Sequence, residues 1–389
     1  MYRIAFFSIY AYGHTNPTLP VVRELTSRGH VVRYYSFSPF RAGIEAAGAE
    51  FVSCDRYMPP PPKDLDRRIG RDFASLVEMV TQVTLNLHSF LGPDLAAFRP
   101  DCIVSDSLCF WGKLWAHRLV VPYLCSTTTF AFNRQTARLM RQSPSQLLRL
   151  LAGRRRISQC MDRLRAHGYP VSGLLSLIQN DNETDTIVYT SRQFQPMSEC
   201  FSDRYAFIGP SLPEVSHAPR MPGRQHLYIS LGTVNNRALP FYHACLEAFR
   251  DVPLEVVLST GSQEAAAQLG TPPSHITILP KVDQLEVLSH TDVFLTHCGM
   301  NSVSEGLYLG VPLVLFPQQE EQRLVARRAA QLGAGVFLRH PRPEAIRQAV
   351  FQVLTHPEYQ AHAEAVSQGF RAAGGFRRGA DKVLSVAAR

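Results

Sequence analysis

The stretch that decides the fold is DVFLTHCGMNSVSEGLYLGVPLVLFPQQEEQ, residues 292–322. Its two apolar runs, VFLT and VPLVLF, are rich in β-branched and aromatic residues, as is typical of parallel strands buried on both faces. The turn CGMNS lies between them, and we expect Asn301 and Ser302 to cap a helix that begins at about Val303. The stretch therefore predicts a strand–helix–strand unit of an α/β protein.

The junction between the first of these strands and the helix has the properties of an anion site. Unpaired N–H groups and the positive end of the helix dipole point to the same place at a helix N-terminus. Here the junction carries hydrogen-bonding side chains and a glycine: His297, Asn301, Ser302 and Gly299. Glu305 lies one turn further on the same helix face, where a carboxylate can accept both hydroxyls of a ribose. The pattern predicts a site for a nucleoside diphosphate.

The same stretch resembles the donor-binding signature of the family 1 glycosyltransferases with the GT-B architecture. Within that family it is most similar to the bacterial macrolide glycosyltransferase group, through Thr-His-x-Gly-Met-Asn-Ser, an acid after the serine, Gly-Val-Pro and a final acid–Gln pair. One departure is Cys298, where this group usually has glycine and plant relatives have cysteine. The resemblance implies that Glu321 and Gln322 hold sugar hydroxyls and favour a fully hydroxylated hexose. The alternative is a polar helix start.

Composition places the chain among globular proteins. It has 389 residues, of which 45% are hydrophobic and 19% charged, enough for two domains. The eight cysteines form no C-x-x-C pair or zinc spacing, which favours reduced thiols and a cytoplasmic location. The opening segment MYRIAFFSIYAYGH is too short and too polar for a signal peptide or a spanning helix. The net charge of +8 suits anionic small molecules, and no nucleic-acid motif accompanies it.

The order of apolar runs, loops and turn residues predicts two Rossmann-like doubly wound parallel sheets. Residues 1–208 are expected to form an acceptor-binding domain, and 209–223, which include SLPEVSHAPRMPG, an interdomain linker. Residues 224–372 are expected to form the domain that binds the nucleotide sugar. In the GT-B fold, a tail such as 373–389 is implied to return to the first domain as a helix.

Two residues at strand ends form a candidate catalytic pair. His14 lies in the predicted loop Tyr10–Thr15 after the first strand, and Asn16 with Pro17 is expected to begin the next helix. Asp106 ends another strand at the same edge of the sheet. A histidine oriented by an aspartate is the usual general base for a hydroxyl, and nearby helix N-termini favour its neutral form. The resemblance implies the same pair, although a strand-end aspartate is also a common helix cap.

Four further donor-site residues lie in two loops of the second half. The resemblance implies that the Gly232-Thr233 loop faces the diphosphate, with Thr233 contacting the β-phosphate. It also implies that the backbone around Val282 and Gln284 reads uracil. Lys281 stands where many relatives have an aromatic residue or an arginine that stacks on the base.

Two other segments were considered as binding sites. Asp64-Leu65-Asp66 has the form of a manganese motif, but it follows a proline run and no strand precedes it, so we interpret it as a solvated loop. No other metal spacing occurs, and no cofactor is expected. The arginine-rich segment 134–165 is expected to be a pair of basic amphipathic helices with a solvated face. Contact with a membrane surface is the alternative, and the family places part of the acceptor pocket in this region.

Together these features predict an inverting, metal-independent O-glycosyltransferase. His14 would take a proton from a hydroxyl of a hydrophobic small molecule, such as a macrolide, another polyketide or a phenol. The donor would be a UDP-sugar, with glucose expected, and the site around His297 would stabilise the departing diphosphate. Three alternatives remain: a GT-B sugar-nucleotide epimerase or hydrolase, a non-catalytic nucleotide-sugar-binding protein, and a transferase that acts on a lipid or cell-wall intermediate. We expect a monomer or a weak dimer.

Overall fold

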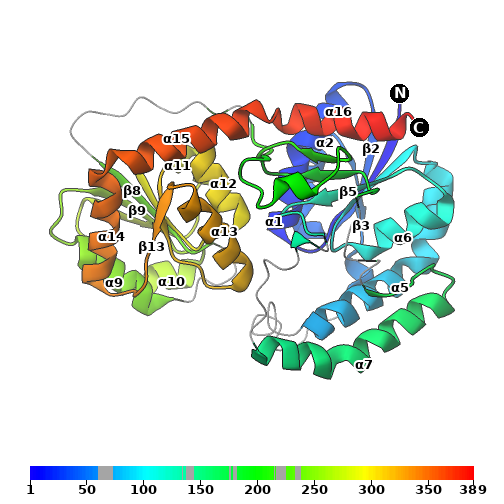
Figure 1. Cartoon of the computed structure of the whole chain (residues 1–389), viewed down its shortest axis with the longest axis horizontal. Helices are drawn as coiled ribbons and strands as arrows, with labels where there is room; N and C mark the ends of the chain where they lie inside the picture. Colours follow the sequence, from blue (N-terminus) through cyan, green and yellow to red (C-terminus); the bar gives the residue numbers. More distant parts are fainter. Residues whose placement is uncertain are drawn as a thin grey trace. The chain divides into compact units, whose positions relative to one another are not determined.

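Two separate parallel β-sheets organise the chain (Figure 1). The computed structural model describes residues 1–59, 73–133, 135–136, 144–174, 177, 182–213, 215, 225–232 and 238–389. The chain divides into two compact units: Met1–Ser211 with Ala373–Arg389, and Leu212–Ala372. The expected linker at 209–223 lies mostly outside the described residues, as do Asp64, Asp66 and Thr233.

The first unit is built on a seven-stranded sheet with the order β3-β2-β1-β4-β5-β6-β7, in which every pairing is parallel. The central strand β4 is buried along its whole length, and its neighbours β1 and β5 are buried except at their first residues. The strands are β1 (Arg3–Phe7), β2 (Val31–Ser36), β3 (Glu50–Ser53), β4 (Cys102–Asp106), β5 (Tyr123–Thr127), β6 (Thr186–Val188) and β7 (Tyr205–Phe207).

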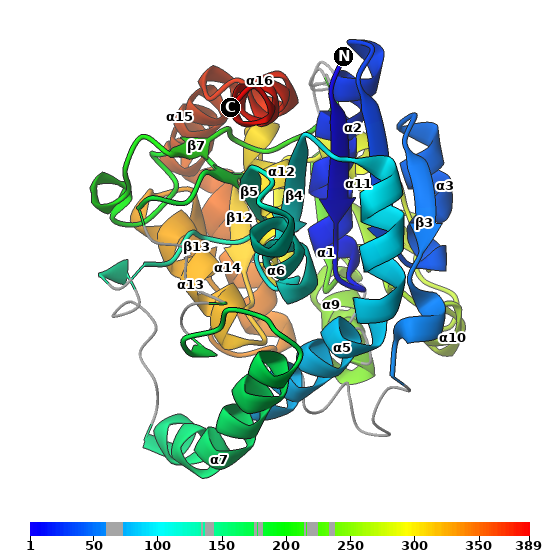
Figure 2. The same cartoon turned by 90° about the vertical axis from the view of Figure 1, so that its right-hand side faces the viewer.

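Helices cover both faces of this sheet (Figure 2). Those described before the second unit are α1 (Tyr12–Thr15), α2 (Leu19–Ser27), α3 (Arg41–Ala46), α5 (Phe73–Phe98), α6 (Phe110–Leu119) and α7 (Pro144–Ala166), with the short 3-10 turns η1 (Asn16–Thr18), η2 (Ser38–Phe40), η3 (Asp55–Tyr57) and η5 (Ser198–Cys200).

The predicted loop at Tyr10–Thr15 is partly helical, which corrects the sequence analysis. Its last four residues form α1, and η1 and α2 follow without interruption. Asn16 therefore has helical dihedral angles (φ −56°, ψ −44°) and is not an N-cap; it is the C-cap of α1. The chain is already helical when it reaches Asn16, so no helix start is left there for its side chain to cap.

The second unit repeats the topology with a six-stranded parallel sheet of order β10-β9-β8-β11-β12-β13. Both sheets reverse their strand order once, between β1 and β4 and between β8 and β11. Ligands of such sheets bind at the carboxyl ends of the strands where the order reverses. The predicted pair of Rossmann-like sheets is thus confirmed. The strands are β8 (His226–Ser230), β9 (Glu255–Ser259), β10 (Ile276–Leu279), β11 (Val293–Thr296), β12 (Leu313–Leu315) and β13 (Gly335–Phe337).

The helices of the second unit alternate with its strands. They are α9 (Leu239–Phe249), α10 (Gln263–Gln268), α11 (Gln284–Ser289), α12 (Met300–Tyr308), α13 (Glu320–Gln331), α14 (Pro343–Thr355) and α15 (Pro357–Ala372).

Helix α7 contains the described part of the arginine-rich segment. It is one helix of 23 residues that packs against α5, instead of the expected helical pair (Figure 2). Arg154 and Arg155 are exposed, while Arg156 forms an ion pair with Glu78 of α5. Among the described residues, no helix is long and apolar enough to cross a membrane. The buried side of α7 includes Ile157, Cys160, Met161 and Leu164.

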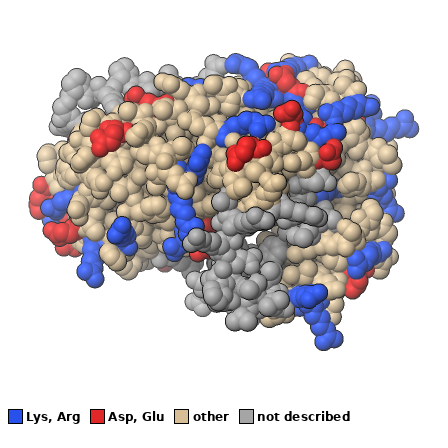
Figure 3. Space-filling view, viewed as in Figure 1, with Lys and Arg blue, Asp and Glu red and all other residues tan. Residues whose placement is uncertain are grey.

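Helix α16 (Gly375–Ala387) belongs to the first unit, where it packs against α2 (Figure 1). Asp185 fastens it: this carboxylate is only 6% exposed and lies 2.6 Å from Lys382 Nζ and 2.5 Å from Arg389 Nη1. Arg204 approaches the same carboxylate at 3.0 Å. Burial alone would raise the pKa of Asp185, but hydrogen bonds from Lys382 and Arg389 outweigh burial and lower it. Lys and Arg side chains gather along this part of the surface (Figure 3).

Replacing Asp185 with Ala should lower the free energy of unfolding by about 1–3 kcal/mol, because a buried hydrogen-bonded charge cluster loses its centre. Urea unfolding would measure this loss, and hydrogen exchange should show faster exchange in α16. The matched control is Asp381→Ala on the same helix, whose carboxylate is 65% exposed and pairs with Arg28. That change should cost less than about 1 kcal/mol. Equal effects of the two substitutions would contradict the anchoring role of Asp185.

Candidate functional site

The turn that carries His14 is fastened to the first sheet by buried hydroxyl groups. Thr15 Oγ1 lies 2.8 Å from Ser8 Oγ, just beyond the end of β1. Thr18 Oγ1 lies 2.8 Å from the hydroxyl of Tyr34 in β2, and all four hydroxyl side chains are buried. Because satisfied buried polar groups hold one geometry, His14 is presented from a rigid base at the carboxyl edge of the sheet.

The structure brings His14 and Asp106 together. His14 Nδ1 lies 2.7 Å from Asp106 Oδ2, and the Asp106 side chain is only 2% exposed. The other oxygen, Oδ1, accepts a hydrogen bond of 2.9 Å from the backbone N–H of Leu108. Asp106 therefore contacts the histidine and also stabilises the turn at Leu108. It is not a helix cap, because the N-cap of α6 is Cys109. An Nδ1–H that donates to Asp106 leaves the basic lone pair on Nε2.

A third side chain, which the sequence analysis missed, contacts the same imidazole. Thr128 Oγ1 lies 3.1 Å from His14 Nδ1, and Thr128 is 3% exposed. Thr128 directly follows β5, the neighbour of β4 in the sheet. The only signal in the sequence is the run Ser-Thr-Thr-Thr that starts at Ser126.

At the edge of the second sheet, two glycines leave room for the ring of His297. A Cβ atom at Gly232 would lie 2.7 Å from His297 Nε2, and one at Gly299 would lie 2.6 Å from the same atom. Gly232 also has a φ of +77°, which side chains rarely adopt. Burial lowers the pKa of His297 to about 4, so this imidazole is neutral at physiological pH and offers a hydrogen bond but no charge.

Cys298 adopts a backbone conformation that favours glycine. Its φ is +68°, in the left-handed region, and its side chain is fully buried. Its Sγ lies 3.4 Å from the backbone oxygen of Thr296. The conformation gives a physical reason for the glycine that the sequence analysis expects at this position in related proteins, because glycine adopts positive φ without steric cost.

The helix after β11 begins earlier than predicted. Helix α12 starts at Met300, and its N-cap is Gly299, with φ −60° and ψ 142° and no side-chain cap. Asn301 and Ser302 therefore lie inside the first turn, and the prediction that they cap a helix from Val303 is wrong. Extended dihedral angles are required of a cap residue, and here Gly299 has them. Since glycine has no side-chain acceptor, this helix end is suited to an anionic ligand.

Gln284 and Glu305 form a polar network beside this helix end. Gln284 Nε2 donates to Glu305 Oε2 and lies 3.4 Å from Ser302 Oγ, while Tyr228 donates to Gln284 Oε1 at 3.3 Å. Burial raises the pKa of Glu305 to about 7. Three of the predicted donor-site residues, Gln284, Ser302 and Glu305, are thus in direct contact.

The remaining predicted donor-site residues occupy two helix starts. Val282 precedes α11 and is partly buried, while Lys281 beside it is exposed. Glu321 is exposed in the first turn of α13. Gln322 Oε1 accepts hydrogen bonds from the backbone N–H groups of Gln318 at 2.8 Å and Gln319 at 3.1 Å. Gln322 therefore caps α13, and only its NH₂ group is left to donate to a sugar.

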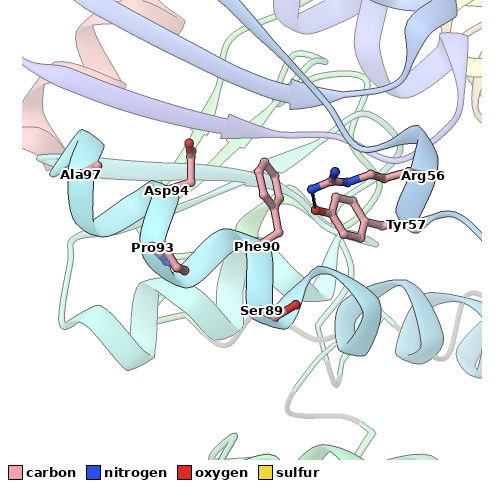
Figure 4. A pocket seen from close by; sticks show the side chains of 7 residues that line it. All are labelled: Arg56, Tyr57, Ser89, Phe90, Pro93, Asp94 and Ala97. Carbon is pink, nitrogen blue, oxygen red and sulfur yellow. Dashed lines mark hydrogen bonds between the residues drawn. The ribbon is translucent and has the colours of Figure 1, made fainter.

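A surface hollow of about 520 Å³ lies elsewhere on the first unit (Figure 4). Tyr57 stacks on Phe90 with ring centroids 5.1 Å apart, and Arg56 donates a hydrogen bond to Tyr57. Asp94 accepts a hydrogen bond of 2.6 Å from Tyr35. None of the predicted site residues lines it. The hollow is lined by Arg56, Tyr57, Ser89, Phe90, Pro93, Asp94 and Ala97.

No group of three or more His, Cys, Asp or Glu residues that could hold a metal ion occurs in the described part of the chain.

Comparison with known proteins supports the resemblance. A family model described as "Erythromycin biosynthesis protein CIII-like, C-terminal domain" matches residues 243–373. The chain is 31% identical to the NDP-glycosyltransferase YjiC of Bacillus subtilis, over 98% of this chain and 96% of that protein. It is 32% identical to the demethyllactenocin mycarosyltransferase of Streptomyces fradiae, over 87% of this chain and 76% of that protein.

The fold is also similar to solved structures. The glycosyltransferase of kitacinnamycin superposes with a TM-score of 0.82 at 27% identity, covering 99% of this chain and 98% of that one. The donor signature and the two Rossmann-like sheets therefore point to the same conclusion as the full-length relatives. The chain belongs to the family 1 glycosyltransferases of the GT-B fold, in the bacterial macrolide and natural-product group.

Proposed function

We propose that this glycosyltransferase is an inverting, metal-independent enzyme that moves a hexose from a UDP-sugar to a hydroxyl of a hydrophobic small molecule. Glucose is the proposed sugar, and a macrolide, another polyketide or a phenolic natural product is the proposed acceptor. The observation that carries the proposal is the 2.7 Å contact between His14 Nδ1 and the buried carboxylate of Asp106. A base oriented in this way suits the activation of a hydroxyl.

The proposed reaction is a single displacement. Nε2 of His14 takes the proton of the acceptor hydroxyl while its oxygen attacks the anomeric carbon of the sugar. The bond between that carbon and the diphosphate oxygen breaks, and its electron pair leaves with UDP. Asp106 stabilises the imidazolium that forms, because it already accepts the hydrogen bond from Nδ1. Attack on the face opposite the leaving group inverts the anomeric carbon.

The departing diphosphate would be stabilised at the N-terminus of α12. The helix dipole and the backbone N–H groups of the first turn supply positive potential without a metal ion. His297 and Ser302 would add hydrogen bonds, and the neutral state of His297 means that it acts as an N–H donor. Thr233, which lies outside the described residues, remains a proposed contact of the β-phosphate together with Gly232.

The nucleoside and the sugar would be held by the polar groups around α11, α12 and α13. Glu305 would accept the two ribose hydroxyls, which would take over part of its bonding to Gln284. The segment at Val282 would contact the base through its backbone. Glu321 and the NH₂ group of Gln322 would bind sugar hydroxyls. Asn301 would add a polar contact at the helix start.

The proposal predicts that UDP is released from UDP-glucose only when an acceptor is present, and that EDTA does not prevent the release. His14→Ala should lower the turnover number at least 100-fold, because the hydroxyl loses its base. A coupled UDP assay with a panel of macrolides and phenols would measure this. His243→Ala, an exposed position on α9, is the matched control.

Three other outcomes of this assay would contradict parts of the proposal. Release without an acceptor would indicate a hydrolase or an epimerase. Release only from a dTDP-linked deoxysugar would overturn the choice of UDP and of a fully hydroxylated hexose. Loss of release in EDTA that added Mg²⁺ restores would overturn metal independence.

Glu305 should make the stability of the ligand-free protein depend on pH. Its pKa is raised from 4.5 to about 7 by burial, so the folded protein retains a proton that the unfolded chain loses. Stability should therefore fall as the pH rises from 4.5 to about 7 and level off above that range. In Glu305→Gln this dependence should disappear, which makes the variant more stable than the wild type at pH 8 by about 1–3 kcal/mol.

Denaturant unfolding of wild type and Glu305→Gln between pH 5 and 8 would measure the difference in their free energies of unfolding. The contributions of the other titrating groups, which both proteins share, cancel in this difference. Glu320→Gln, an exposed position in the first turn of α13, is the matched control. Parallel pH profiles of wild type and Glu305→Gln would contradict the raised pKa. The same variant should bind UDP more weakly, and unchanged UDP affinity would contradict the ribose contact.

A further inference from the structure

Three neighbouring strands of the first sheet end beside the imidazole of His14. They are β1, β4 and β5, and they place His14, Asp106 and Thr128 at one edge. We propose that Thr128 is a positioning residue for His14. The hydroxyl of Thr128 and the carboxylate of Asp106 together fix the imidazole ring so that its Nε2 faces the acceptor. This inference rests on the proposed role of His14 as the base, and it adds a residue that acts through His14.

Two oxygen atoms lie within hydrogen-bond distance of one nitrogen of His14. His14 Nδ1 lies 2.7 Å from Asp106 Oδ2 and 3.1 Å from Thr128 Oγ1. The shorter contact to a carboxylate is the stronger bond. Both acceptors constrain the direction of the single N–H that they share. Rotation of the ring about Cβ–Cγ is therefore more restricted than it would be with one acceptor.

Thr128 is itself held in place, as a positioning residue must be. It is 3% exposed and follows β5 directly. Two contacts fix the end of this strand: Tyr189 N–H donates to the backbone oxygen of Thr127 at 3.2 Å, and Ser126 Oγ lies 3.1 Å from the hydroxyl of Tyr189. The Thr128 hydroxyl therefore approaches Nδ1 from a fixed backbone.

The chemistry gives the two acceptors different effects. When His14 takes a proton it becomes a cation, and both acceptors bind the Nδ1–H of the cation more strongly than that of the neutral ring. Asp106 contributes a full negative charge, whereas Thr128 contributes only a dipole. Removal of the Thr128 hydroxyl should thus disturb the direction of the ring and lower its basicity slightly, while removal of the Asp106 charge should lower its basicity more.

The test compares Thr128→Val, which has nearly the same shape, with Thr128→Ser, which keeps the hydroxyl. Thr128→Val should lower kcat about 3- to 10-fold, as expected for one neutral hydrogen bond, with the KM for the donor unchanged. Thr128→Ser should stay within about 2-fold of the wild type. Thr127→Val is the matched control, since its hydroxyl lies 3.6 Å from Cys125 Sγ on the same strand, and it should not change kcat.

A second measurement does not need turnover. Imidazole ¹⁵N and ¹H signals of His14, assigned by their loss in His14→Gln, would be followed against pH in the free protein. The midpoint should move to lower pH in Thr128→Val and further in Asp106→Asn, and the acid limb of the kcat/KM profile should move in the same direction. If no donor and acceptor pair is turned over, the proposed function fails while this titration still decides the role of Thr128.

Four results would overturn the proposal. These are a wild-type titration midpoint for Thr128→Val, wild-type kcat for that variant, and a failure of serine to restore activity. The fourth is a raised donor KM with unchanged kcat in Thr128→Val, which would make the threonine a donor contact instead.

Discussion

Parallel hydrogen bonding between neighbouring strands is the constraint on which the rest of the structure depends. In the first sheet, Phe7 of β1 is paired with Ser105 of β4, and Asp106 is paired with Ser126 of β5. This register brings the ends of three strands, which lie far apart in the sequence, to one line. A histidine just beyond one end and an aspartate at the next then meet without any long loop. The second sheet uses the same order of strands to bring Gly232 beside His297.

The sequence predicted those parts of the fold that depend on composition over several residues. The buried strands of residues 292–322 and the two sheets follow from apolar runs and their turn residues. The pairing of His14 with Asp106 was predicted because both stand at strand ends, where the topology of such sheets is known. Prediction failed where the dihedral angles of a single residue decide where a helix begins. At α12 the N-cap is Gly299 and not Asn301. Thr128 was missed because its partner, His14, lies in α1 after β1, and β4 separates β1 from β5 in the sheet.

The two carboxylates of the candidate site, Asp106 and Glu305, have different hydrogen-bond partners. Asp106 is buried and keeps two hydrogen-bond donors around it, so its carboxylate has partners for both oxygens. Glu305 has Gln284 as its amide partner, and burial raises its pKa to about 7. His297 is held neutral by burial as well. At the proposed donor site, Glu305 is therefore only partly ionised at neutral pH in the ligand-free protein.

The discontinuity of the first unit has a consequence for the order in which the chain folds during synthesis. Residues 212–372, which make up the second unit, leave the ribosome before α16 does. Until then Asp185 lacks Lys382 and Arg389, the two cations that lie closest to it. The second unit can therefore reach its native state while the first is still missing a helix. Val21 of α2, which lies against Gly379 of α16 in the folded unit, is meanwhile uncovered on that side.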